Sequence, residues 1–198
     1  MTLAKCKSCG VRLDPFVELE FPLIALELML HRVPAFRHVL CNRVLEVSIW
    51  LRFALVINLI EVLAHFWITR KDPTLDEVVV HLTQSLIVFT SSLMCFCTCV
   101  TLLSSKPFAS LATFVERTGC QMRALILSRF PSLLLVVAMA WWYPSDFYPV
   151  IALYTFSTSI AAARALPEID SMWKASLVAF CGVIPRIMKA VLTAGDKR

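Results

Sequence analysis

Three groups of side chains in the sequence have types and spacings that could do chemistry. The first, Cys6-Lys7-Ser8-Cys9-Gly10, is a Cys-X-X-Cys-Gly knuckle, a turn in which two thiolates converge on one side of a tetrahedral zinc ion. A zinc ribbon needs a second such pair, and none occurs elsewhere in the chain. Cys6 and Cys9 are therefore predicted as half of a zinc site, with a reduced thiol pair in a turn as the alternative interpretation.

The second group lies inside an apolar stretch of the chain. Asn58, Glu61 and His65 are spaced i, i+3 and i+7, so on a helix they share one face. An ionisable group inside a membrane span is expensive and usually points into the bundle or a wet cavity. We expect this polar stripe to contact a lipid or a partner. A protonated Glu61 carboxyl bonded to Asn58 or to a neighbouring helix is the alternative.

The third group is basic and comes just before the first long apolar run. Arg37 and His38 could hold a lipid phosphate through charge-assisted hydrogen bonds. The alternative is that both side chains extend to the membrane surface and anchor the following helix there.

The composition defines the elements that must position these groups. Of the 198 residues, 59% are hydrophobic and 17% are charged, which is too apolar for an ordinary soluble domain. No Gly-X-Gly-X-X-Gly or phosphate-loop pattern occurs, and the net charge of +5 comes from basic residues that punctuate hydrophobic runs. Their expected partners are lipid phosphates, and no nucleic acid is expected. The sequence predicts an all-α integral membrane protein.

About four transmembrane helices are expected. The clearest lies within residues 78–105, which contain no Asp, Glu, Lys or Arg and exceed the roughly 20 residues that cross a bilayer core. The predicted spans lie near residues 48–69, 78–103, 124–143 and 147–165. The last two form a helical hairpin around Pro144, Ser145 and Asp146.

Other apolar segments carry charges, and for these we predict interfacial amphipathic helices. Residues 176–194 have apolar side chains at helical spacing, interrupted by Arg186 and Lys189, and a fifth span is the alternative. Residues 16–30 contain glutamates and residues 108–129 contain arginines, so both are expected at the membrane surface. The distribution of Lys and Arg in the flanks predicts that both termini are cytoplasmic.

The residues around and after the knuckle resemble a known family. Leu3, Cys6, Cys9, Asp14, Phe16, Glu18, His31-Arg32 and the run from Ala35 to Asn42 are similar to the homology domain of the Arv family, small multispanning proteins of the endoplasmic reticulum. By this resemblance residues 1–42 are an Arv-like head and residues 43–198 a multispanning membrane domain. The family usually carries two Cys-X-X-Cys pairs, and this sequence begins just before what would be the second. The resemblance therefore leaves two interpretations: either the chain is shortened and lacks the first pair, or this member has abandoned the zinc site. Phe36 replaces the family's Tyr and keeps the aromatic anchor.

The resemblance implies a role in distributing sterols and other lipids from the endoplasmic reticulum, with links to sphingolipid homeostasis and to the synthesis of glycosylphosphatidylinositol (GPI) anchors. It adds Asn42 to Arg37 and His38 as a contact position for a headgroup or partner. We expect a non-enzymatic protein of the endoplasmic-reticulum membrane whose partners are membrane lipids and sterols. A scaffold or accessory subunit of a lipid or GPI biosynthetic enzyme is the alternative.

A membrane-embedded hydrolase or acyltransferase is disfavoured by the sequence. Such an enzyme needs a nucleophile, a base and a group that orients the base, and no such set occurs at a helpful spacing. The sequence leaves the oligomeric state open.

Overall fold

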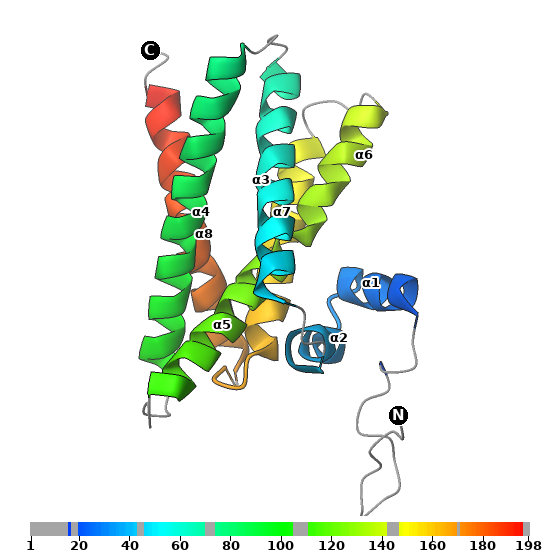
Figure 1. Cartoon of the computed structure of the whole chain (residues 1–198), viewed down its shortest axis with the longest axis vertical. Coiled ribbons are helices and arrows are strands. Elements are labelled where there is room, and N and C mark those ends of the chain that lie inside the picture. Colours follow the sequence, from blue (N-terminus) through cyan, green and yellow to red (C-terminus); the bar gives the residue numbers. More distant parts are fainter. Residues whose placement is uncertain are drawn as a thin grey trace, which may run out of the picture.

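The computed structural model describes residues 16, 20–42, 46–69, 74–104, 111–141, 147–169 and 171–195. Within these residues every regular element is helical, which confirms the predicted all-α class for this part of the chain. Figure 1 shows long helices that run roughly side by side, with short helices lying across one end. Cys6, Cys9 and the predicted turn at residues 144–146 lie outside the described residues.

The short helices form the described part of the head. Helices α1 (Phe21–Met29) and α2 (Val33–Arg37) each carry a proline in their first turn. A backbone N–H in the first turn has no acceptor within the helix, so a proline there costs no helical hydrogen bond. A π-helical turn, η2 (His38–Asn42), continues α2. The buried side chains of Ile24, Leu28 and Phe36 fasten the head to the bundle.

Among the described residues, three helical segments are long and apolar enough to cross a membrane, and they make this a membrane protein. Two are single helices, α3 (Val47–Thr69) and α4 (Leu75–Leu103). The third joins α5 (Leu111–Ser128), the 3₁₀ turn η3 (Phe130–Leu133) and α6 (Leu134–Ala140). The first two coincide with the spans predicted near residues 48–69 and 78–103.

The third segment differs from its prediction. We expected residues 108–129 at the membrane surface and a span near residues 124–143, but the apolar segment that the structure describes runs from Phe114 to Ala140. Pro131 in the first turn of η3 interrupts the helix without ending the segment. A proline inside a helix removes one backbone hydrogen bond and introduces a kink, which is what separates α5 from α6.

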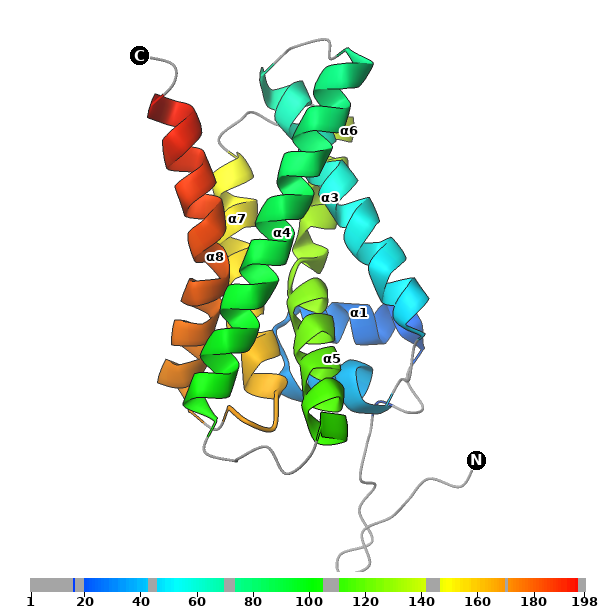
Figure 2. The ribbon, with the colours of Figure 1, turned by 60° about the vertical axis from the view of Figure 1, so that its left-hand side comes forward.

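Two more helices complete the bundle. Helix α7 (Phe147–Ala165) packs against α5, and α8 (Met172–Gly195) packs along α4 and α7. We predicted a surface position for residues 176–194, whereas in the structure α8 runs along the bundle rather than across its end (Figure 2). Its buried face consists of small side chains, Ala175, Val178 and Ala179, and this allows close packing.

Successive long segments run in opposite directions. Following the colours of Figure 1, α3 leaves the head, α4 returns, the α5–α6 segment leaves again, α7 returns and α8 leaves. The carboxyl end of α8 therefore lies at the end of the bundle opposite the head, which we call the far end (Figure 1).

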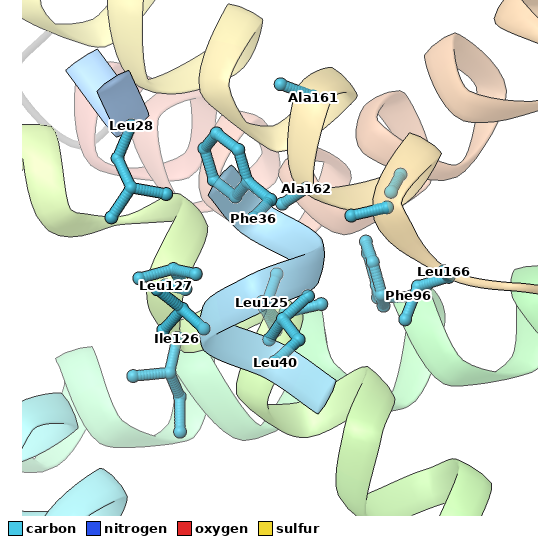
Figure 3. Packing of buried hydrophobic residues seen from close by; sticks show 14 of the residues in the cluster. Leu28, Phe36, Leu40, Phe96, Leu125, Ile126, Leu127, Ala161, Ala162 and Leu166 are labelled. Carbon is cyan, nitrogen blue, oxygen red and sulfur yellow. The ribbon is translucent and has the colours of Figure 1, made fainter. Parts of the chain in front are cut away.

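The main core joins the head to the bundle. Figure 3 shows Phe36 and Leu40 of the head among side chains of three other elements. These are Phe96 of α4, Leu125 and Ile126 of α5, and Ala162 of α7. The aromatic anchor expected at Phe36 is completely buried. The head and the bundle thus share one hydrophobic core.

Candidate functional site

A cluster of polar side chains lies inside the bundle where α3, α4 and the break between α5 and α6 meet. Its centre is Arg129, whose side chain is 4% exposed. The guanidinium donates hydrogen bonds to Asn58 Oδ1 at 3.3 and 3.4 Å and to Glu61 Oε2. Its Cζ also lies 5.0 Å from the centre of the Phe89 ring, a cation–π distance.

Two serines complete this cluster. Ser132 Oγ donates to Glu61 Oε1 at 2.9 Å, and Ser85 Oγ donates to Asn58 Oδ1 at 2.9 Å. Asn58 in turn donates its amide to the Ala54 carbonyl at 2.8 Å. We call Asn58, Glu61, Ser85, Arg129 and Ser132 the Arg129 cluster. Because its members come from α3, α4 and the helix break, the cluster ties three elements together.

The helix break is what brings Arg129 and Ser132 to the same carboxylate. The Ser132 N–H donates to the Arg129 carbonyl at 2.9 Å, an i to i+3 bond of the 3₁₀ type. In a 3₁₀ turn the side chains at i and i+3 eclipse each other. Arg129 and Ser132 therefore point in the same direction, and Glu61 accepts a hydrogen bond from each of them.

The charges of the cluster cancel. Arginine stays protonated in proteins, and a buried cation without an anion nearby is strongly unfavourable. Glu61 supplies the opposite charge, and hydrogen bonds from Ser132 and to Asn58 compensate part of the desolvation of the pair. The Arg129 guanidinium lies against both Glu61 and Asn58, so the partner of the Glu61 carboxyl comes from a neighbouring helical segment, one of the two partners that the alternative interpretation names.

Exposure rises along the polar stripe of α3. Asn58 is 0% exposed, the Glu61 side chain is 20% exposed, and His65, two turns from Asn58 on nearly the same face, is exposed. The exposed leucines 55, 59 and 63 lie roughly 120–160° around the helix from Glu61. The inner face of α3 thus becomes accessible toward the far end, and Glu61 is the first charged group of the cluster along that approach.

The structure brings Asn58 and Glu61 together at Arg129, and it places His65 further along α3, beside α4. The His65 ring lies 5.3 Å from the His81 ring of α4 and 5.9 Å from Phe66. His65 is about 10 Å further along the helix axis than Asn58.

The structure places Arg37 and His38, which we predict as a headgroup contact, in different surroundings. Arg37 is exposed, and its Nη2 donates to the Arg164 carbonyl at 3.5 Å. His38 is 4% exposed and lies beside Phe16, with ring centres 6.0 Å apart. Adjacent residues in a helix point about 100° apart, which turns one outward and the other inward. Asn42 ends η2, and its side chain lies outside the described part of the structure.

A second polar contact fastens the head to α7. His31 Nε2 lies 2.9 Å from Thr158 Oγ1 and 3.0 Å from Ser157 Oγ. The His31 ring also packs edge-on against Tyr154, whose hydroxyl donates to the Met29 carbonyl. The backbone φ of His31 is 56°, in the left-handed region, and this turns the chain between α1 and α2. We call His31, Tyr154, Ser157 and Thr158 the head anchor.

Metal binding finds no support within the described residues. No group of three or more His, Cys, Asp or Glu side chains in that part of the chain could hold a metal ion. The predicted half-site at Cys6 and Cys9 lies outside it.

The fold and the cluster together define a class: a helical membrane protein with a buried ion pair inside its bundle and a head across one end. A family model described as the Arv1-like family matches residues 1–163, and the chain belongs to this family. The chain is also similar to "Protein arv1 homolog" of Dictyostelium discoideum. The identity is 25% over 209 residues, which cover 94% of this chain and 82% of that protein. No solved structure matches the chain significantly.

The resemblance drawn from the sequence is thereby confirmed at the level of the family. Membership suggests a role in sterol and lipid homeostasis.

Proposed function

We propose that this protein handles sterols and other lipids within the endoplasmic-reticulum membrane by binding and distributing them, without catalysing a reaction. Family membership supports the link to lipids. The observation that carries the mechanism is the Arg129 cluster, a set of charged and polar groups inside an apolar bundle whose carboxylate is partly accessible. Sphingolipids and GPI-anchor intermediates fall under the same proposal, because they too are membrane lipids with a polar group.

The physical reason lies in the cost of moving a polar group through hydrocarbon. Transfer of a hydroxyl or amide from water to an apolar phase without a hydrogen-bond partner costs roughly 2–7 kcal/mol, depending on the reference state. Donors and acceptors held inside the bundle replace the partners that the lipid leaves at the membrane surface. A protein that offers such groups lowers the barrier for a lipid to move out of its place in the leaflet.

The head end of the bundle supports the same function and a cytoplasmic amino terminus. Arg32, Arg37, Arg52 and Arg164 are exposed at or near that end. Clustered basic residues attract anionic headgroups and usually face the cytoplasm. We therefore propose a cytoplasmic head, with Arg37 as the headgroup contact. Cys6 and Cys9 remain a proposed half-site for zinc.

A second candidate function follows from the outer face of α1. Phe21, Leu23, Leu26 and Leu30 are exposed on the head, an apolar surface that favours contact with a membrane interface or a partner subunit. In this alternative the protein is a scaffold or accessory subunit of a lipid or GPI biosynthetic enzyme, and the bundle serves as its anchor.

Native mass spectrometry of the full chain, extracted in mild detergent, separates the two functions. Lipid handling predicts a sterol or phospholipid retained at a fixed stoichiometry. It also predicts faster sterol transfer between donor and acceptor vesicles that contain the protein. A lipid-free mass together with a retained enzyme subunit would overturn lipid handling in favour of the accessory role.

A further inference from the structure

We infer that the Arg129 cluster binds the hydroxyl group of a lipid and that Glu61 accepts the hydrogen bond from it. This inference rests on the proposed lipid-handling function and names the chemical class of its ligand. The ligand is a neutral lipid with a free hydroxyl, such as a sterol or a diacylglycerol, rather than a lipid whose polar end is a phosphate.

The order of exposure in the cluster decides which chemistry a ligand meets first. The Glu61 side chain is 20% exposed, whereas that of Arg129 is 4% exposed. An ionised carboxylate only accepts hydrogen bonds. A group that approaches along the accessible side must therefore donate, which a hydroxyl does and a phosphate diester does not.

The charge of the cluster points the same way. Arg129 and Glu61 neutralise each other, so the cluster offers no net attraction to an ion. A phosphate would meet the negative carboxylate before the buried guanidinium and would be repelled. An ammonium group would be drawn to Glu61 but repelled by Arg129 behind it. A neutral hydrogen-bond donor is repelled by neither Glu61 nor Arg129.

The depth of Glu61 in the bundle favours a ligand with a small polar group. Glu61 precedes the end of α3 at Thr69 by eight residues, which at 1.5 Å each places it about 12 Å along the helix from the far end. A ligand that reaches it must bring its polar end below the membrane surface. The cost of this transfer is several kcal/mol for a single hydroxyl and much larger for a charged headgroup.

The approach to Glu61 is itself polar. His65 is exposed one turn closer to the far end, and His81 of α4 is half-buried beside it. The polar stripe of α3 therefore continues from the accessible end to the cluster. At the cluster, Ser132 and Arg129 hold the carboxylate in place before any ligand arrives. A fixed acceptor loses less entropy when it binds than a mobile one.

The test uses the full chain in nanodiscs with a photoactivatable diazirine cholesterol as the probe. Unlabelled cholesterol should compete for labelling, and cholesterol methyl ether should compete at least tenfold more weakly, because the ether keeps the sterol body but cannot donate. A lost hydrogen bond to a charged group is worth about 1.5–3 kcal/mol, and about 1.4 kcal/mol is a factor of ten. Dioleoyl phosphatidic acid should not compete.

A fourth competitor, dioleoylglycerol, identifies the source of the hydroxyl. Competition by dioleoylglycerol assigns the cluster to hydroxyl lipids in general, and its failure restricts the site to sterols. Equal competition by cholesterol and its methyl ether, or stronger competition by phosphatidic acid, would overturn the inference while leaving lipid handling intact. Absence of any sterol labelling or transfer would instead count against the proposed function.

A variant pair adds a test on the protein side. Glu61→Leu combined with Arg129→Met removes both charges together, so neither is left buried alone. This double variant should lose the tenfold preference for cholesterol over its ether. The matched control is Glu116→Gln, an exposed carboxyl of α5 outside the cluster, which should keep that preference. A preference retained by the double variant would contradict the assignment, and the ether comparison on the unaltered chain stands even if the double variant fails to fold.

Discussion

The Arg129 guanidinium and the Glu61 carboxylate, 68 residues apart in the chain, form an ion pair that holds the break between α5 and α6 against the middle of α3. A kinked helix has lost part of its own backbone hydrogen bonding at the kink. The ion pair and the Ser132 hydrogen bond supply contacts to another helix at that point. Contacts with α3 thus stabilise the break between α5 and α6.

This pairing predicts a non-additive effect of mutation. Arg129→Met alone removes the cation beside a partly buried carboxylate and should cost about 3–5 kcal/mol of unfolding free energy. Glu61→Leu alone should cost a similar amount for the opposite reason. The two changes together should cost clearly less than either one. Tryptophan fluorescence during thermal unfolding in detergent measures all three variants.

The control for this cycle is Arg52→Met, which removes an exposed arginine of the same helix α3. It should change stability by no more than about 0.5 kcal/mol. If the double variant were as unstable as the sum of the single variants, the ion pair would not couple the two helices.

The head anchor predicts that His31 controls how firmly the head is docked. His31→Gly should speed amide hydrogen exchange in α1 and α2, because the ring that meets Ser157 and Thr158 is lost. His31→Ala should speed it further, since alanine also strains the left-handed backbone by about 1–2 kcal/mol. Exchange in α4 should stay unchanged in both.

Thr90→Val is a suitable control, because this exposed hydroxyl donates to the Ile87 carbonyl of its own helix. Unchanged exchange of the head in His31→Gly would show that the ring contacts do not hold it.

The contact between α4 and α8 predicts opposite effects at two glycines. A Cβ at Gly182 would lie 3.4 Å from Phe96 Cδ2 and 3.8 Å from Leu125 Cδ1, whereas a Cβ at Gly119 would meet nothing within 4 Å. Gly182→Leu should therefore lower the unfolding free energy by about 1–3 kcal/mol through overpacking. Gly119→Leu should leave stability unchanged or raise it by up to about 1 kcal/mol, since glycine is a poor helix former. Thermal unfolding of both variants checks this, and equal effects would place α8 away from α4.

The direction of α8 predicts where its carboxyl end lies relative to the head. Because α8 leads to the far end, epitope tags at the two termini should lie on opposite sides of the membrane. Protease added to sealed microsomes should therefore digest one tag and leave the other intact. After permeabilisation both tags should be digested. Identical protection of both tags would favour a surface position for α8 and the predicted arrangement with both termini on one side.

The parts of the fold that depend on composition were predictable from the sequence. Residues 48–69 and 78–103 are long apolar runs, and they form α3 and α4. The position of α8 was not predictable in this way, because Arg186 and Lys189 favour a surface helix over a fifth span. What positions α8 is the fit of Ala175, Val178 and Ala179 against other helices, and such a pairwise fit cannot be read from one sequence.

The site was half predictable for a related reason. Helical periodicity brought Asn58 and Glu61 to one face, but it gave no sign of their partner. In the sequence Arg129 is one of the charges that predict a surface helix at residues 108–129, since its counter-ion lies 68 residues away. A usable signal was present: Arg129 comes two residues before Pro131, inside an apolar stretch that also lies within a predicted span. A charge beside a helix break needs a partner from another helix.

The head anchor has a consequence for the order in which the newly made chain can fold. His31 meets residues that come 126 and 127 positions later, so the ribosome must have made most of the protein before these partners exist. Chains emerge amino end first, and early segments wait for later ones. During synthesis the head therefore lacks its anchor to α7, and the apolar surface that packs there is uncovered, until α7 enters the membrane. Truncation before residue 157 leaves that early segment as a target for chaperones and for degradation.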